Sequence, residues 1–312
     1  KSAEEGALRD TMARIEVQYG VAFEWDFLAT DYEPVGVGEA LSYAKTADYA
    51  AILRVVQYIE KNVFCFFPES FIKEYMPRNI FLVDSLISVY RHEDAVNEVS
   101  WQNNRAITGN ITDKYLALGN VNERFNPTLA LQEELLSLFI EYLFNNNRMP
   151  PVPEGIKAAT EKAATDVGAI IYTNPSRPNS NYPYLDGRYT TWAGTGDDST
   201  ATPWLGRGIL KMGRIGMTGY SRDVIYGIDL RSYSVHRGTL AQDLADFAAF
   251  ILLHSPNERE AFYAQVEADS RAYTYVGYPP DPRFPYGGPA GAAAMRAKDA
   301  VAQSYLKEVF GN

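Results

Sequence analysis

The sequence predicts an α+β protein that is mainly helical, with a small sheet in its N-terminal half and a long loop-rich segment. Apolar residues recur at helical spacing in both halves of the chain, whereas strand-like runs occur before residue 126. Residues 172–237 are dense in Pro, Gly, Asn and aromatic residues, which is typical of a long ordered loop. We expect one domain over residues 1–312, with a sheet-containing sub-lobe (1–125) and a helical sub-lobe (126–312).

The elements of the first half follow from capping residues and periodicity. Ser2 and Glu5 have capping-box spacing, so a helix is expected over residues 3–16. Apolar residues at helical spacing, with a cap at the start, predict a second helix from Thr46. The other predicted elements are a strand in the alternating IEVQYGVAFEWDF (15–27), a short helix in ESFIKEYM (69–76), a buried strand in NIFLVD (79–84) that SLISVYR (85–91) extends or pairs beside, and a strand in DKYLALGN (113–120).

The second half is predicted to be helical around the loop-rich segment. LQEELLSLFIEYLF (131–144) has no breaker, Asn126 can cap it and Pro127 suits its first turn. Apolar residues cover nearly its whole circumference, which is typical of a helix at the centre of a domain. The remaining predicted elements are a helix over 155–168, two helices that start at the capping boxes Thr239/Gln242 and Ser255/Glu258, a loop over 276–292, and a last helix that ends at Phe310 before Gly311.

Composition excludes several classes of protein and site. The 29 Lys and Arg against 39 Asp and Glu give a net charge of −10, so nucleic acid is a poor partner. Cys65 is the single cysteine, which rules out an intrachain disulfide and a Cys₂His₂ zinc site. It stands among aromatic residues, so we expect it to be buried. No segment reaches the roughly 20 apolar residues that span a bilayer.

The three histidines do not form a zinc-binding pair. Zinc hydrolases place two imidazoles one helical turn apart, but His92, His236 and His254 are widely separated. His92 is expected in a polar surface cluster, and His254 at a helix end, where the macrodipole favours a cation. The role of His236 is open.

Paired carboxylates are the other candidates for hydrolytic chemistry. Glu133 and Glu134 are adjacent, so they point about 100° apart on a helix and do not face one substrate together. Asp243 and Asp246 are one turn apart. They are interpreted as a solvated face or as structural hydrogen-bond acceptors, and alternatively as a relocated active site with His236.

Aromatic residues of the loop-rich segment are candidates for ligand binding. They can line a groove that stacks on sugars or packs against peptide, or they can pin the loop to the body of the protein. The six candidates are Tyr182, Tyr184, Tyr189, Trp192, Trp204 and Tyr220.

Several motifs together resemble a known family. They are FIKEYMPRNIFLVDS (71–85), the helix after NPTLA, PVPEGI, GRIGMTGYSR, ADFAAF and ILLHSPNE. In order and spacing they resemble the substrate-import-associated zinc metallohydrolase lipoproteins, surface lipoproteins of Gram-negative bacteria encoded beside SusC/SusD-type nutrient importers. The resemblance covers the chain from about Glu24 to its end and implies a zincin-like fold.

The resemblance also implies that the metal site is degenerate. The family's central helix carries His-Glu-x-x-His, and here Gln132 replaces the first histidine, Glu133 matches the glutamate and Leu136 replaces the second histidine. A later Glu-Asp-Phe-Ala-Glu segment falls on residues 245–249, where Asp246 is kept and both glutamates are alanine. Leucine has no lone pair for zinc, and without zinc nothing lowers the pKa of an attacking water. We therefore expect no cofactor and no metal.

The expected function is that of a catalytically inactive surface lipoprotein. By the resemblance it assists a TonB-dependent SusC/SusD-type importer in the outer membrane, binds a peptide or glycan or the importer itself, and is tethered by a lipid upstream of Lys1. The alternatives are an active hydrolase with a non-standard metal site and a glycan-binding module unrelated to peptidases.

Overall fold

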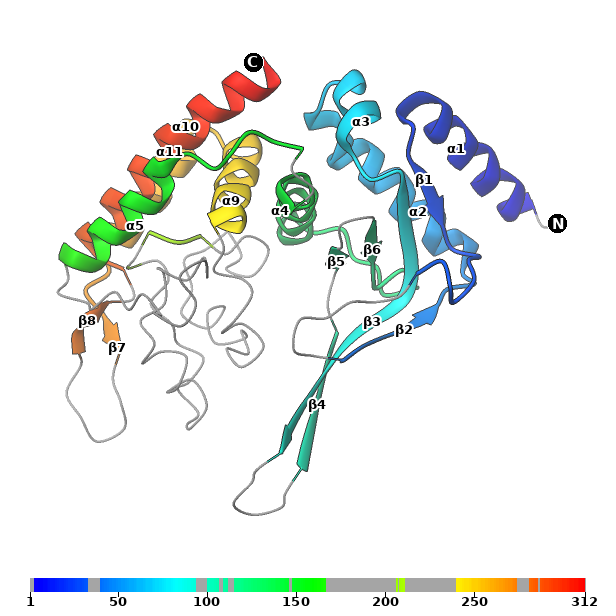
Figure 1. Ribbon diagram of the computed structural model, residues 1–312, viewed down its shortest axis with the longest axis horizontal. Helices are drawn as coiled ribbons and strands as arrows, with labels where there is room; N and C mark the ends of the chain where they lie inside the picture. Colours follow the sequence, from blue (N-terminus) through cyan, green and yellow to red (C-terminus); the bar gives the residue numbers. More distant parts are fainter. Residues whose placement is uncertain are drawn as a thin grey trace. The chain divides into compact units, whose positions relative to one another are not determined.

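A computed structural model defines the fold. It describes residues 3–32, 40–93, 100–106, 109–111, 115–145, 148–166, 206, 208–210, 240–273, 281–285 and 287–311. Its helices and strands, drawn in Figure 1, are α1 Ala3–Tyr19, β1 Ala22–Glu24, β2 Ala40–Lys45, α2 Tyr49–Asn62, η1 Phe64–Phe66, α3 Glu69–Tyr75, β3 Asn79–Glu93, β4 Ser100–Ala106, β5 Gly109–Ile111, β6 Leu116–Leu118, α4 Leu129–Asn145, α5 Glu154–Asp166, α9 Leu240–Leu253, α10 Pro256–Ala268, β7 Ala272–Tyr273, β8 Asp281–Pro285 and α11 Pro289–Phe310. The predicted α+β class is confirmed.

The chain forms two compact units. Unit 1 comprises residues 1–128 and 142–149, and unit 2 comprises residues 129–141 and 150–312. The six-stranded sheet belongs to unit 1, and the helices from α5 onward belong to unit 2. The single domain over 1–312 and its division at residue 125 stay predictions.

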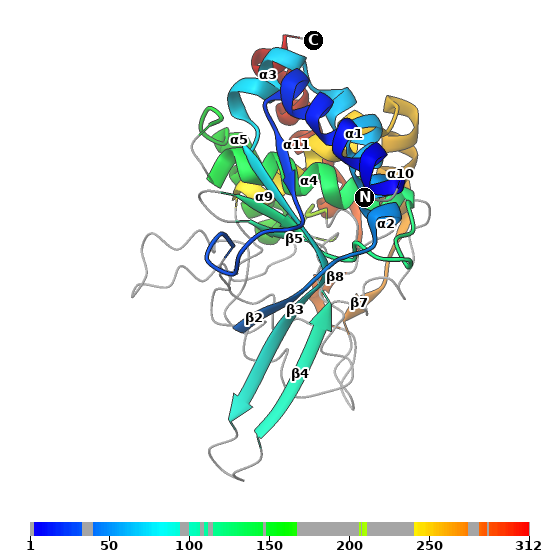
Figure 2. The same cartoon turned by 90° about the vertical axis from the view of Figure 1, so that its right-hand side faces the viewer.

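β3 is the central strand of unit 1. Its first half pairs in parallel with β1 and β6, and β5 continues the sheet antiparallel to β6. Its second half pairs antiparallel with β2 and β4, and Figure 2 shows β3 and β4 running side by side as a long ribbon. SLISVYR therefore extends the predicted NIFLVD strand rather than pairing beside it.

Continuous burial explains why NIFLVD occupies the middle of the sheet. Residues Ile80 to Val83 are all buried, which is typical of a strand covered on both faces. Phe81 packs against Phe27 and Tyr32, with ring centroids 4.9 and 5.3 Å away, in an aromatic cluster that also contains Val83. These contacts bury large apolar surfaces and stabilise unit 1.

Two predictions in unit 1 are wrong in detail. The alternating stretch 15–27 is not one strand, because α1 runs to Tyr19 and ends where Gly20 adopts φ +69°, so that only Ala22–Glu24 is extended. Val17, an apolar position of the apparent alternation, is 83% exposed. Cys65 is exposed rather than buried, and in the same 3-10 turn after α2 it is Phe64 that is buried.

Unit 2 is organised around α11, which packs against α5, α9 and α10 (Figure 1). The predicted capping box is confirmed at the start of α10, where Ser255 accepts from the Glu258 backbone and Glu258 accepts from the Ser255 backbone. Gly311 caps the C-terminus of α11 with φ +70°, as predicted. Side chains of the predicted Thr239/Gln242 box lie outside the described residues.

Two boundaries in the second half differ from expectation. α4 begins at Leu129, so Asn126 and Pro127 precede the helix instead of capping it, and the Thr128 N–H bonds to the Asn126 carbonyl. The segment 276–292, predicted as a loop, contains β8, which pairs with β7. A strand of five residues with two prolines lacks the alternation from which a strand is predicted.

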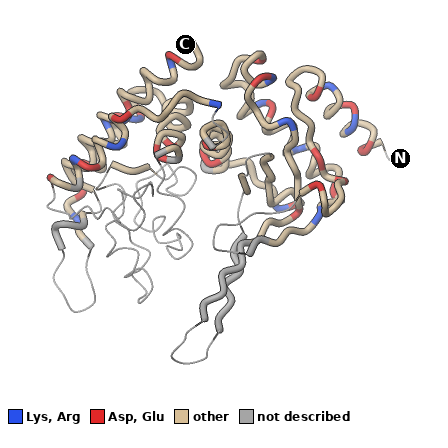
Figure 3. The backbone as a smooth tube through the Cα atoms, viewed as in Figure 1, with Lys and Arg blue, Asp and Glu red and all other residues tan. Residues whose placement is uncertain are grey.

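Charge is spread over both units. Figure 3 shows acidic and basic residues on helices of both units, whereas α4 and α9 carry acidic residues and no Lys or Arg. None of the helices in the described part of the chain has the length and apolar character needed to cross a bilayer.

Candidate functional site

Glu133, which the resemblance aligns with the glutamate of the family's zinc motif, lies inside unit 2. Glu133 on α4 is fully buried, and its Oε1 lies 3.0 Å from Nε2 of His254, the residue that follows α9. The His254 side chain is 10% exposed. The two residues form a buried carboxylate–imidazole pair that joins α4 to the junction between α9 and α10.

A second polar pair lies one helical turn along α4. Ser137, four residues after Glu133, donates to Oδ1 of Asp246 on α9 over 2.5 Å, and both side chains are buried. Residues at i and i+4 share one helical face. The same face of α4 thus presents Glu133 and Ser137 to α9 and its C-terminal end.

Positions where the resemblance places zinc ligands are filled by apolar side chains. Leu136, which replaces the second motif histidine, has no exposed surface. Ala245 and Ala249, which replace the two glutamates of the later motif, are also fully buried. Hydrocarbon therefore packs where ligand atoms would be needed.

The residues present do not fit a zinc ion. A catalytic zinc takes three protein ligands from Cys, His, Asp or Glu, but of the motif positions only Glu133 and Asp246 keep such a group, and each has an intramolecular partner. Gln132 offers a neutral amide, which is a weak ligand. Within the described ranges, no group of three or more His, Cys, Asp or Glu side chains is placed to hold a metal.

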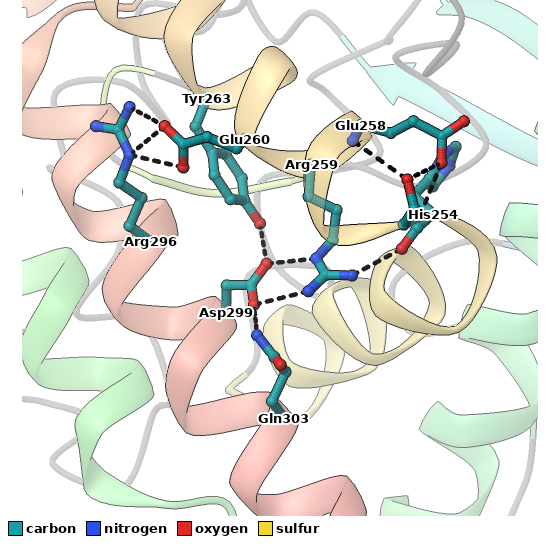
Figure 4. A network of polar contacts seen from close by, with 9 residues as sticks. His254, Glu258, Arg259, Glu260, Tyr263, Arg296, Asp299 and Gln303 are labelled. Atoms are coloured by element: carbon teal, nitrogen blue, oxygen red, sulfur yellow. Dashed lines mark hydrogen bonds and ion pairs between the residues drawn. The ribbon is translucent and has the colours of Figure 1, made fainter.

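His254 is held in place by a network that reaches α11 (Figure 4). Arg259 on α10 donates from Nη1 to the His254 carbonyl over 2.7 Å, and its Nε donates to Asp299 on α11 over 2.7 Å. Tyr263 and Gln303 also donate to the Asp299 carboxylate. Burial, reinforced by the hydrogen bond to Asp299, raises the pKa of Tyr263.

A buried ion pair joins α9 to α11. Lys298 on α11 has no exposed side-chain surface and donates to Asp243 over 2.5 Å and to the Gly208 carbonyl over 2.9 Å. Burial lowers the pKa of Lys298, and the Asp243 carboxylate opposes that shift. Gly208 has φ +72°, and a Cβ there would overlap the side chain of Ala294. The hydrogen bond from Lys298 to the Gly208 carbonyl holds Gly208 against α11.

The candidate carboxylates Asp243 and Asp246 act as buried structural acceptors. Their predicted interpretation as hydrogen-bond acceptors is confirmed, and the solvated face is wrong because both are buried. They bond to different helices, Asp243 to α11 and Asp246 to α4. The third member of the proposed relocated site, His236, lies outside the described residues.

The helix-end explanation of His254 is incomplete. The macrodipole accounts for a cation at the end of α9, but the imidazole also contacts a buried carboxylate 121 residues earlier in the chain. The side chain of His92 on β3 lies outside the described residues. So do the six aromatic candidates for ligand binding, Tyr182, Tyr184, Tyr189, Trp192, Trp204 and Tyr220.

Sequence reasoning missed the partners in this site. Ser137, Lys298, Arg259 and Asp299 stand in ordinary helical segments, and none belongs to a short motif. One signal was present for Lys298 and Asp299, because they interrupt, together with Arg296, a run of small apolar residues on α11. A signal was also present for His254, because it lies in ILLHSPNE beside the Ser255 capping box.

No protein-family model and no curated protein matches this sequence. Among solved structures, the chain is similar to the crystal structure of a candidate zinc-binding metallo-peptidase from Bacteroides caccae. The sequence identity is 11% and the TM-score 0.47, with 100% of this chain and 88% of that chain covered. A likeness at this level does not establish a shared fold, so the zincin-like fold stays a prediction.

Proposed function

We propose that this chain is a catalytically inactive, metallopeptidase-like surface lipoprotein that assists a SusC/SusD-type importer in the outer membrane. The observation that carries the loss of catalysis is the fully buried Leu136, at the position of the second zinc-binding histidine. Glu133 supports it, because a carboxylate paired with His254 inside the protein is not available to activate a water molecule.

The accessory role rests on the resemblance of the sequence motifs. Under this proposal the protein binds a peptide or glycan, or the importer itself, through the loop-rich surface around residues 174–236, and a lipid upstream of Lys1 holds it at the cell surface. Aromatic residues such as Trp192 and Trp204 provide the contact area for such a ligand.

Metal content and hydrolysis test the loss of catalysis. The protein is purified from cells grown with added zinc, its metal content is measured by mass spectrometry, and it is incubated with a peptide library. We expect less than stoichiometric zinc and no hydrolysis. One zinc per chain that is lost in Glu133→Ala would show that the motif still holds metal and would refute the proposal.

Co-purification and ligand arrays test the accessory role. Native protein extracted from outer membranes is expected to bring importer subunits with it, and its absence from that fraction would contradict the assignment. For ligand binding, Trp192→Ala and Trp204→Ala are compared with Trp25→Ala in unit 1, on peptide and glycan arrays. Loss of binding in the first two variants alone supports the loop-rich segment as the binding surface. If all three variants bind equally well, the binding surface lies elsewhere on the protein.

A further inference from the structure

The two polar pairs of the site join the same helices that carry the degenerate metal motif. Glu133 and Ser137 lie on α4, Asp246 lies on α9 and His254 directly follows it. In a zinc protein, ligands on separate helices make the metal a cross-link, and its binding energy adds to folding stability. We propose that the Glu133–His254 pair takes over this role as a metal-free cross-link between α4 and the α9–α10 junction. The inference rests on the proposed identity of α4 as a former zinc helix.

The buried Glu133 carboxylate depends on His254 for a hydrogen bond. The carboxylate is fully buried, and within the described part of the chain its Oε2 has no hydrogen-bond partner. His254 on Oε1 is therefore the group that compensates the carboxylate. A buried carboxylate that loses its compensating partner is strongly destabilising, whereas an imidazole that loses its partner can remain neutral. Glu133 therefore depends on His254 more than His254 depends on Glu133.

Contacts other than the one with Glu133 also hold His254 in position. Its backbone N–H bonds to the Phe250 carbonyl over 3.0 Å, and its own carbonyl accepts from Arg259, which is bonded to Asp299 on α11. The imidazole also packs against the Phe250 ring, with centroids 4.9 Å apart. Because the imidazole is already ordered, the hydrogen bond to Glu133 costs little further entropy. The cross-link therefore runs from α4 through the α9–α10 junction to α11.

A double-mutant cycle tests the cross-link. Thermal unfolding is followed by circular dichroism for His254→Leu, Glu133→Leu and the double variant. We expect His254→Leu to lower Tm by roughly 6 to 20 °C, Glu133→Leu to lower it less, and the double variant to be more stable than His254→Leu alone. The matched control is Glu134→Leu, the neighbouring carboxylate on α4, whose effect should add to that of His254→Leu.

Two results would overturn the cross-link. One is strict additivity in the Glu133/His254 cycle, and the other is a His254→Leu variant as stable as the native protein. Because the single variants can fail to fold, the native protein is also studied by NMR. The His254 Hε2 proton should be protected from exchange with water, and an unprotected proton contradicts the pair. Neither measurement depends on zinc content, so zinc in the native protein would refute the proposed function while the cycle still decides the cross-link.

Discussion

A histidine at position 136, where the resemblance expects a zinc ligand, should damage the protein rather than create a metal site. Leu136 is fully buried, so Leu136→His removes a well-packed side chain and puts a polar ring in its place. Losing the buried leucine costs about 1.5–3 kcal/mol. Burying an imidazole without a hydrogen-bond partner costs about 1–3 kcal/mol more. The sum of about 2.5–6 kcal/mol is a large share of the ~5–15 kcal/mol by which proteins are stable.

This loss is measured by thermal unfolding with and without zinc. At about 2–4 °C per kcal/mol, Tm should fall by roughly 5 to 24 °C, and zinc should not restore it. Leu136→Met is the matched control, because it keeps the volume and should cost less than about 1.5 kcal/mol. The Gln132→His/Leu136→His variant should behave like Leu136→His. Suppose instead that the double variant bound one zinc and recovered the native Tm. The interpretation of position 136 as a packed apolar site with no room for a metal ligand would then be wrong.

Three further changes test other contacts of unit 2. Lys298→Met removes the cation beside the buried Asp243 carboxylate and should cost about 3–5 kcal/mol in urea denaturation, part of which Lys298→Met/Asp243→Leu recovers. Gly208→Ala places a Cβ at φ +72° against α11 and should cost about 1–3 kcal/mol in the same assay, and an unchanged midpoint would contradict the close packing. Hydrogen bonds from Ser255 hold the pKa of Glu258 below its ordinary value of 4.5, so this stabilisation is present above pH 4.5 and is lost as the pH falls through the folded pKa. Glu258→Gln should therefore lower stability at pH 7, and its difference from the native protein should shrink in acid. A constant difference would show that the charge is not responsible.

Local signals were sufficient to predict most elements of the fold. The capping box at Ser255 and the glycine at Gly311 mark helix ends through contacts within one turn, and both are confirmed. The run from Ile80 to Val83 marked the central strand by continuous hydrophobicity. Local patterns failed where two elements share one pattern. Around Gly20, the end of a helix and the start of a strand together imitate an alternating strand.

The sequence by itself determined which ligand atoms this protein lacks, because a missing imidazole at Gln132 and Leu136 is a matter of residue identity. Only the tertiary structure decided what the retained groups do. Glu133 and His254 are 121 residues apart, and the contact between them depends on how helices pack. The same is true of Lys298 and Asp243, 55 residues apart. Partners of buried charges are set by long-range packing, which no spacing along the chain encodes.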